Sequence, residues 1–158
     1  MGQIIEIIFE DLEADGQYKI FEEIRHLIPR NSFLNADEDA FKLNQITPEL
    51  MLSLQSRNEN YSLTIDPKFL DLDSVLIRFP RISFVKYDGS KLDININFEI
   101  ELVKSISKSQ VIQSLHNFAI KLAKKNYVKT YFCGLDPAVD ENTRFFTNEK
   151  LGPYFFPT

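Results

Sequence analysis

The sequence predicts an α+β fold: a mostly antiparallel sheet of about five to six strands, with two to three helices packed on one face. Three observations lead to this prediction. The chain has 158 residues, 44% of them are hydrophobic, and stretches with a two-residue hydrophobic period lie between stretches with a helical period. This length fits one compact domain. We therefore expect a single domain over residues 1–158, with an irregular, aromatic-rich tail over residues 135–158.

The first 60 residues predict one strand and two helices. Residues 3–9 are dense in β-branched side chains and favour a buried strand, although so short a run also fits a helix start. Apolar residues recur at helical spacing over residues 20–28, and Pro29 ends that predicted helix. Residues 31–46 show no sustained period and leave room for one helical turn. Residues 47–57 begin with Thr-Pro-Glu, an order typical of a helix N-terminus, and predict a second helix.

From residue 61 the hydrophobic period changes to two. This predicts strands over residues 61–66, 74–79 and 82–84. The pair Asp88-Gly89 tolerates positive φ at both central positions of a tight hairpin turn, so the next strand should run back antiparallel. Residues 91–102 alternate apolar and polar side chains without interruption. We expect this strand to bury one face and expose the other.

The last third of the chain predicts a helix, a strand and the tail. Residues 107–126 return to the helical period and end in a group of lysines, which the helix dipole favours there. Residues 127–134 predict a strand. Seven aromatic residues lie between positions 131 and 158, and they either close the core or stay exposed for a partner.

Composition and charge narrow the classes of partner. The net charge is -5 and the isoelectric point is near 5.1, with -8 on residues 1–79 and +3 on residues 80–158. This balance argues against nucleic acid and favours a basic protein partner. No apolar run reaches the roughly 18 residues of a membrane span, and residues 1–6 lack the basic start of a secretion signal. With a single cysteine, Cys133, we expect a cytoplasmic protein with no cofactor and no metal site.

Enzyme signatures are absent from the sequence. There is no phosphate-binding glycine loop, no paired-histidine zinc motif and no nucleophile elbow, so we predict no catalytic residues. His26 and His116 fit ordinary surface or boundary positions better than catalytic ones. Cys133 lies among aromatic residues and fits a small buried hydrophobe. The group of Asp66, Asp71 and Asp73 fits a solvated turn rather than a calcium loop.

Two groups of polar residues are candidates for binding a partner. One is the polar side of the strand over residues 91–102, whose acceptors would recur about every 7 Å. It forms either a solvated sheet face or a docking surface for a basic partner; a catalytic carboxylate pair is a third interpretation. The other group lies in the tail. Its acids either cap a turn or face a partner, and its arginine either pairs within the chain or faces a partner. The predicted partner-binding residues are Asp93, Asn95, Asn97, Glu99, Glu101, Asp136, Asp140, Glu141 and Arg144.

The tail also resembles a known class of proteins. Residues 134–147 (Gly-Leu-Asp-Pro-Ala-Val-Asp-Glu-Asn-Thr-Arg-Phe-Phe-Thr) and 151–154 (Leu-Gly-Pro-Tyr) are similar to the loop-rich ends of small bacterial immunity proteins. Those proteins neutralise toxins of contact-dependent or polymorphic systems. The resemblance implies a cytoplasmic inhibitor that binds a cognate toxin domain and blocks its active site or substrate surface.

Two other functions stay open at this point. One is a small hydrolase or transferase whose site combines His116, the tail acids and Arg144. The other is a subunit of a larger assembly, in which the aromatic tail docks on its own or another chain. The sequence leaves the oligomeric state open.

Overall fold

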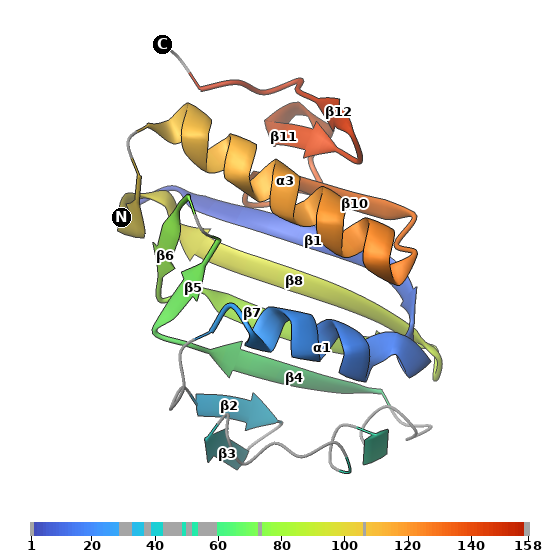
Figure 1. Ribbon diagram of the computed structural model, residues 1–158. Helices are drawn as coiled ribbons and strands as arrows, with labels where there is room; N and C mark the ends of the chain where they lie inside the picture. Colours follow the sequence, from blue (N-terminus) through green and yellow to red (C-terminus); the bar gives the residue numbers. More distant parts are fainter. Residues whose placement is uncertain are drawn as a thin grey trace.

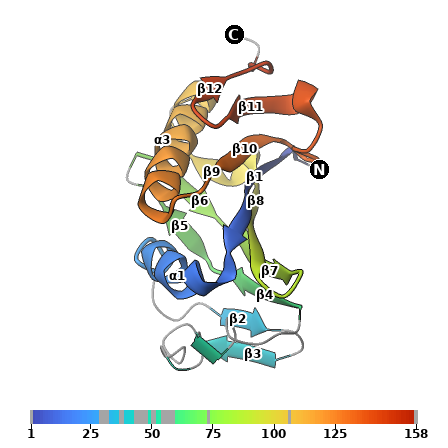
Figure 2. The same ribbon diagram turned by 90° about the vertical axis from the view of Figure 1, so that its right-hand side faces the viewer.

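The part of the chain that the structure describes forms a large antiparallel sheet, with α-helices over residues 17–25 and 108–126 on one face. The computed structural model describes residues 2–28, 33–36, 39–42, 49, 52–53, 60–72, 74–105 and 107–156. The large sheet has nine strands in the order β12-β11-β10-β1-β8-β7-β4-β2-β3, which runs from top to bottom in Figure 1. A three-stranded sheet, in the order β5-β6-β9, lies on the same side as the helices (Figure 2). The predicted α+β class and the helices on one face are confirmed.

The elements follow one another along the chain with short connections in the second half. The helices are α1 (Gln17–Arg25) and α3 (Lys108–Asn126). Short 3-10 helices cover Ala14–Gly16, Ile100–Leu102 and Glu141–Thr143. The strands are β1 (Ile4–Glu13), β2 (Phe33–Ala36), β3 (Asp39–Lys42), β4 (Tyr61–Asp66), β5 (Phe69–Asp71), β6 (Leu76–Arg78), β7 (Arg81–Tyr87), β8 (Lys91–Glu99), β9 (Val103–Lys104), β10 (Thr130–Leu135), β11 (Arg144–Thr147) and β12 (Lys150–Leu151).

The core lies between the large sheet and the helices. Alternate residues of the central strands face α1 and α3 and are at most 5% exposed: Ile5, Ile7, Phe9 and Leu12 in β1, and Leu92, Ile94, Ile96 and Phe98 in β8. The helices supply Ile20, Phe21, Ile24, Val111, Leu115, Ala119 and Leu122. Each large apolar side chain buried in this way stabilises the fold by about 1.5–3 kcal/mol relative to leaving it exposed. The two periods read from the sequence therefore meet in one core.

Local signals in the sequence produce the predicted turn and the start of α3, whereas α1 ends at Arg25, before the end predicted at Pro29. Asp88 and Gly89 adopt φ values of 51° and 72°, so the hairpin between β7 and β8 is confirmed. The side chain of Ser107 accepts a hydrogen bond from the backbone N–H of Gln110 at 3.1 Å and caps α3. Leu27 and Ile28 lie beyond the end of α1 but still pack against the core.

Three predictions about elements are wrong, in each case because contacts distant in sequence decide the structure. Residues 33–36 and 39–42 form the paired strands β2 and β3, not a helical turn, because β2 pairs with β4. The tail adds β11 and β12 to β10, so the sheet is wider than five to six strands. The strand predicted over residues 91–102 ends at Glu99, where the N–H of Ile100 donates to the carbonyl of Gln3 at 3.0 Å.

The aromatic residues of the tail mainly close the core. Phe145 and Phe146 are at most 2% exposed, and the rings of Tyr154 and Phe156 pack against Phe145. Phe155 remains 65% exposed. Of the predicted second helix over residues 47–57, only residues 49, 52 and 53 are described, and they are helical; the rest lies outside the described residues.

Candidate functional site

The face of the large sheet opposite α1 and α3 is the candidate site, and we call it the helix-free face. It lies to the right in Figure 2. Its central strand, β8, contributes three predicted residues, Asp93, Asn95 and Asn97, all half-buried. The strand register surrounds them with Glu6, Ile8 and Glu10 of β1 and with Arg81, Ser83, Val85 and Tyr87 of β7. The expected row of polar side chains on a helix-free face therefore forms over residues 93–97.

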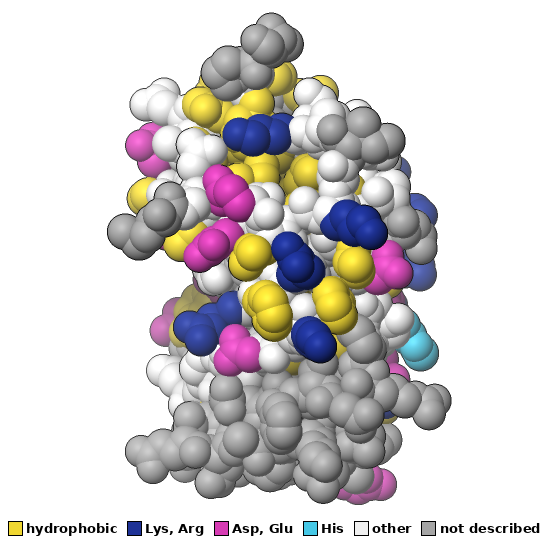
Figure 3. All heavy atoms as spheres, turned by 90° about the vertical axis from the view of Figure 1, so that its left-hand side faces the viewer, with side chains coloured by type: hydrophobic (Ala, Val, Ile, Leu, Met, Phe, Trp, Pro, Cys, Tyr) yellow, Lys and Arg dark blue, Asp and Glu magenta, His cyan; other side chains and the backbone are white. Residues whose placement is uncertain are grey.

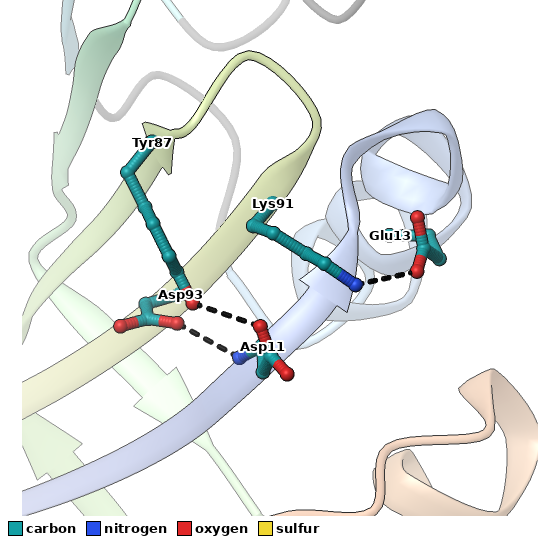
Figure 4. A network of polar contacts seen from close by, with 5 residues as sticks. All are labelled: Asp11, Glu13, Tyr87, Lys91 and Asp93. Carbon is teal, nitrogen blue, oxygen red and sulfur yellow. Dashed lines mark hydrogen bonds and ion pairs between the residues drawn. The ribbon is translucent and has the colours of Figure 1, made fainter.

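At one end of this face Asp93 belongs to a network within the chain (Figure 4). Its carboxylate accepts a hydrogen bond of 2.8 Å from the backbone N–H of Asp11, where β1 bulges at a φ of 61°. The hydroxyl of Tyr87 donates to the Asp11 carboxylate at 3.2 Å, and Lys91 pairs with Glu13 at 2.7 Å. Burial, followed by the hydrogen bonds to Asp93 and Asp11, raises the pKa of Tyr87. Asp93 thus fixes the shape of the bulge.

In the middle of the face Asn95 contacts a residue that sequence reasoning missed. The side-chain amide of Asn95 donates to the carboxylate of Glu6 at 2.7 Å, and the other oxygen of Glu6 accepts from the backbone N–H of Ala138 at 3.0 Å. Glu6 therefore holds the β10–β11 loop, residues 136–143, against the sheet. The signal in the sequence was Glu6 itself, the one acid within the apolar run of residues 4–9.

Arg144 and Asp140 stabilise the same loop. The guanidinium of Arg144 lies 3.9 Å from the ring centroid of Phe132, and its Nε donates to the carbonyl of Ala138 at 2.9 Å. The carboxylate of Asp140 accepts from the N–H of Asn142 at 3.1 Å and caps the 3-10 helix there. Internal pairing of the arginine and capping by an acid were among the predicted alternatives. Asp136 and Glu141 are exposed on the loop.

The opposite end of the face is hollowed. A pocket of about 410 Å³ lies where β1 and β7 begin and β8 ends, and its lining includes Ile4, Phe79, Asn97 and Glu99. Glu99 is exposed as the last residue of β8. Glu101 does not continue the row, because it lies in the 3-10 helix and accepts a hydrogen bond from the N–H of Gln3 at 3.4 Å.

The residues considered for catalysis do not form one site. His116 is buried on α3, its Nε2 is 2.8 Å from the carbonyl oxygen of Asn148, and its ring packs against that of Phe146 in a tilted arrangement. Phe146 pairs with Cys133 on the helix side of the sheet, whereas Arg144 pairs with Gly134 and lies over the helix-free face. The sheet therefore separates the residues of the proposed hydrolase or transferase site.

The remaining candidates fit structural roles. Cys133 is fully buried, as predicted, and desolvation followed by the charge of Glu6 raises the pKa of its thiol. His26 is exposed, and Asp66 pairs with Arg81 at 2.8 Å. Within the described ranges, no three His, Cys, Asp or Glu side chains come together to hold a metal ion. Among the helices that the structure describes, none is long and apolar enough to cross a membrane.

Comparisons with known proteins agree with this architecture. The fold is similar to that of a chain in the crystal structure of the toxic C-terminal tip of CdiA from Pseudomonas aeruginosa in complex with immune protein. The TM-score is 0.81 at 24% sequence identity, over 98% of this chain and 100% of that chain. No curated protein matches the sequence. The family model described as PABL017 Cdi1I immunity protein matches residues 3–151, and the chain therefore belongs to this family of immunity proteins.

Proposed function

We propose that this immunity protein neutralises its cognate toxin domain by binding it through the helix-free face. Family membership makes the chain an immunity protein rather than an enzyme. The proposed contact surface comprises eight of the residues predicted from the sequence: Asp93, Asn95, Asn97, Glu99, Asp136, Asp140, Glu141 and Arg144. Glu101, the ninth, lies in the 3-10 helix beyond β8. The similar solved complex pairs a toxin tip with an immune protein, which supports a protein toxin as the partner here.

The observation that carries this proposal is that α1 and α3 both lie on one face of the large sheet and neither lies on the other. The predicted residues have different tasks on that face. Asp93, Asn95, Asp140 and Arg144 are bonded within the chain and position the bulge and the β10–β11 loop. Glu99, Asp136 and Glu141 are exposed. We expect these three side chains to contact the toxin directly.

Charge gives the expected chemistry of the partner. The chain carries a net charge of -5, so a basic toxin surface would be attracted over a distance and would associate faster. The exposed carboxylates can then pair with Lys and Arg side chains of the toxin. We propose that the complex forms in the cytoplasm and covers the toxin's active site or substrate surface.

The test is a binding and protection experiment with the toxin domain encoded next to this gene. We expect calorimetry at about 150 mM salt to show a stoichiometric complex, with affinity that falls as salt is raised. We also expect cells that express the toxin domain to grow only when this chain is co-expressed. Absence of a complex together with unprotected cells would remove the proposal. Light scattering of the chain alone, over a range of concentrations, measures its oligomeric state and tests the assembly-subunit alternative.

A further inference from the structure

The pocket at the end of the helix-free face combines an apolar interior with a charged rim. Its apolar lining includes Ile4, Pro80, Phe98 and Leu102. Figure 3 looks at this end of the molecule, where hydrophobic side chains are exposed and Asp and Glu side chains gather toward the left of the view. A volume of about 410 Å³ accommodates one large side chain of a protein partner. The chemistry of the rim decides which side chain fits.

Phe79 forms an aromatic wall that is held open to solvent. Its side chain is 60% exposed, and its backbone has a φ of 53°, which bulky residues rarely adopt. The N–H of Phe79 donates to the carbonyl of Lys68 at 2.9 Å and fixes this conformation. Backbone held in such a rare region is concentrated at functional sites, and exposed aromatic rings anchor protein interfaces. The ring is therefore displayed where a partner can reach it.

The carboxylate of Glu99 supplies a negative charge that the described chain does not use. Across the residues that the structure describes, no hydrogen bond or ion pair reaches the side chain of Glu99 or that of Asn97. The pocket lining holds two carboxylates, Asp66 and Glu99, and one cation, Arg81. Arg81 pairs with Asp66 at 2.8 Å, so the charge of Glu99 remains uncompensated in the lining.

We propose that this pocket receives an arginine side chain of the toxin; this inference rests on the proposed function. The aliphatic stem would lie against Ile4 and Leu102, and the guanidinium would stack on Phe79 and donate to Glu99. An arginine suits this rim better than a lysine, because a guanidinium is planar, stacks on aromatic rings and binds a carboxylate with two parallel hydrogen bonds. An apolar side chain would bury Glu99 without a partner, which is unfavourable.

The chain already contains the same arrangement elsewhere. Arg144 stacks on Phe132 at 3.9 Å while its Nε donates to a carbonyl oxygen, and this contact lies on the same face of the sheet. The proposed toxin arginine would repeat that geometry between two molecules, with the Glu99 carboxylate in place of the carbonyl.

The test is calorimetry between the complete chain and the toxin domain encoded next to its gene, at about 150 mM salt. We expect Glu99→Gln and Phe79→Leu each to weaken binding about tenfold, as loss of an interface anchor does. Matched controls remove similar groups elsewhere: Glu149→Gln removes an exposed acid and Phe155→Leu an aromatic ring that is 65% exposed. We expect both controls to bind within about twofold of the wild type. Thermal unfolding of all four variants verifies that they remain folded.

Arginine substitutions in the toxin identify the occupant. We expect one toxin Arg→Ala variant to bind as weakly as the Glu99→Gln chain does, with no further loss when the two are combined.

If the wild type binds but the pocket variants behave like the controls, the pocket inference is wrong and the proposed function stands. If a toxin lysine couples to Glu99 instead, the choice of arginine is wrong. If the wild type does not bind, both proposals fail. A concentration-dependent dimer that Phe79→Leu abolishes would assign the pocket to a second copy of this chain.

Discussion

Glu6 and Asn95 are joined by a 2.7 Å hydrogen bond although 89 residues separate them in the sequence. The same carboxylate accepts the N–H of Ala138 at 3.0 Å, so one acid links the two central strands of the sheet to the β10–β11 loop. The shape of the proposed binding face therefore depends on a residue that does not itself need to contact the toxin.

Replacing Glu6 tests this link. We expect Glu6→Ala to lower the free energy of unfolding by about 2 kcal/mol, because it leaves the half-buried side-chain amide of Asn95 and the N–H of the buried Ala138 without an acceptor. Glu6→Gln should lower the free energy of unfolding by a smaller amount. Asn95 has a buried Oδ1 atom without a hydrogen bond, and this atom can accept from the side-chain amide of glutamine if the Asn95 amide turns. Urea denaturation measures both variants. The control is Glu10→Ala, at a half-buried position on the same strand and face. Equal losses of unfolding free energy in Glu6→Ala and Glu10→Ala would contradict the role of Glu6 in linking the strands to the loop.

Gly134 permits the close approach of β11 to β10. A Cβ atom there would lie 2.7 Å from the carbonyl oxygen of Thr143 and 2.9 Å from the Cα of Arg144, both backbone atoms. We expect Gly134→Ala to destabilise the fold by about 1–3 kcal/mol. At Gly16 an added Cβ meets nothing within 4 Å, so Gly16→Ala should change stability by less than about 1 kcal/mol. Thermal or urea unfolding compares the two variants. Similar losses of stability in Gly134→Ala and Gly16→Ala would argue against the close approach of β11 to β10.

Stability should fall at high pH because of Tyr87. Its pKa is raised above the ordinary value of 10.0, chiefly by burial, so the folded state keeps the phenol proton at a pH where the unfolded state has lost it. The contribution of Tyr87 to the stability of the folded state is complete below pH 10.0 and decreases as the pH rises above that value. We expect Tyr87→Phe to reduce the slope of unfolding free energy against pH in this range. An unchanged slope would contradict the assignment.

The thiol of Cys133 should be inert in the folded protein. It is fully buried, and its pKa is raised by desolvation, so little thiolate is available to react. We expect a thiol-specific reagent to modify Cys133 only at the rate of unfolding and to modify it fully in denaturant. A Ser62→Cys variant, with a second thiol at an exposed position of β4, provides the control for rapid labelling. Equally fast reaction of both thiols would show that Cys133 is accessible.

Signals between near neighbours in sequence predicted much of the fold. The positive φ tolerance of Asp88 and Gly89 placed the hairpin, and the apolar period of residues 107–126 placed α3, because each depends on contacts within a few residues. The strand pairs β2–β3 and β11–β12 were missed because β2 and β11 are stabilised by pairing with β4 and β10, which a hydrophobic period does not report.

The candidate site was predictable only in part. The alternation in β8 placed Asp93, Asn95 and Asn97 on one face, since side chains of a strand alternate. It did not show that Asp93 bonds to Asp11 or that Asn95 bonds to Glu6, because both contacts join segments more than 80 residues apart. It also placed Glu101 on the strand, whereas a backbone hydrogen bond from Ile100 to Gln3 turns the chain after Glu99. The pocket around Phe79 depends on a backbone conformation that has no sequence signal here.

The central claim is that the toxin binds the helix-free face. The most direct measurement is the affinity of two variants that each add one arginine: Val85→Arg, at an exposed position of β7 opposite Asp93, and Gln113→Arg, at an exposed position of α3. We predict that Val85→Arg weakens toxin binding by about a hundredfold or more and that Gln113→Arg leaves it within about threefold. Loss of binding in the α3 variant with wild-type affinity in the β7 variant would place the toxin on the helices and contradict the account.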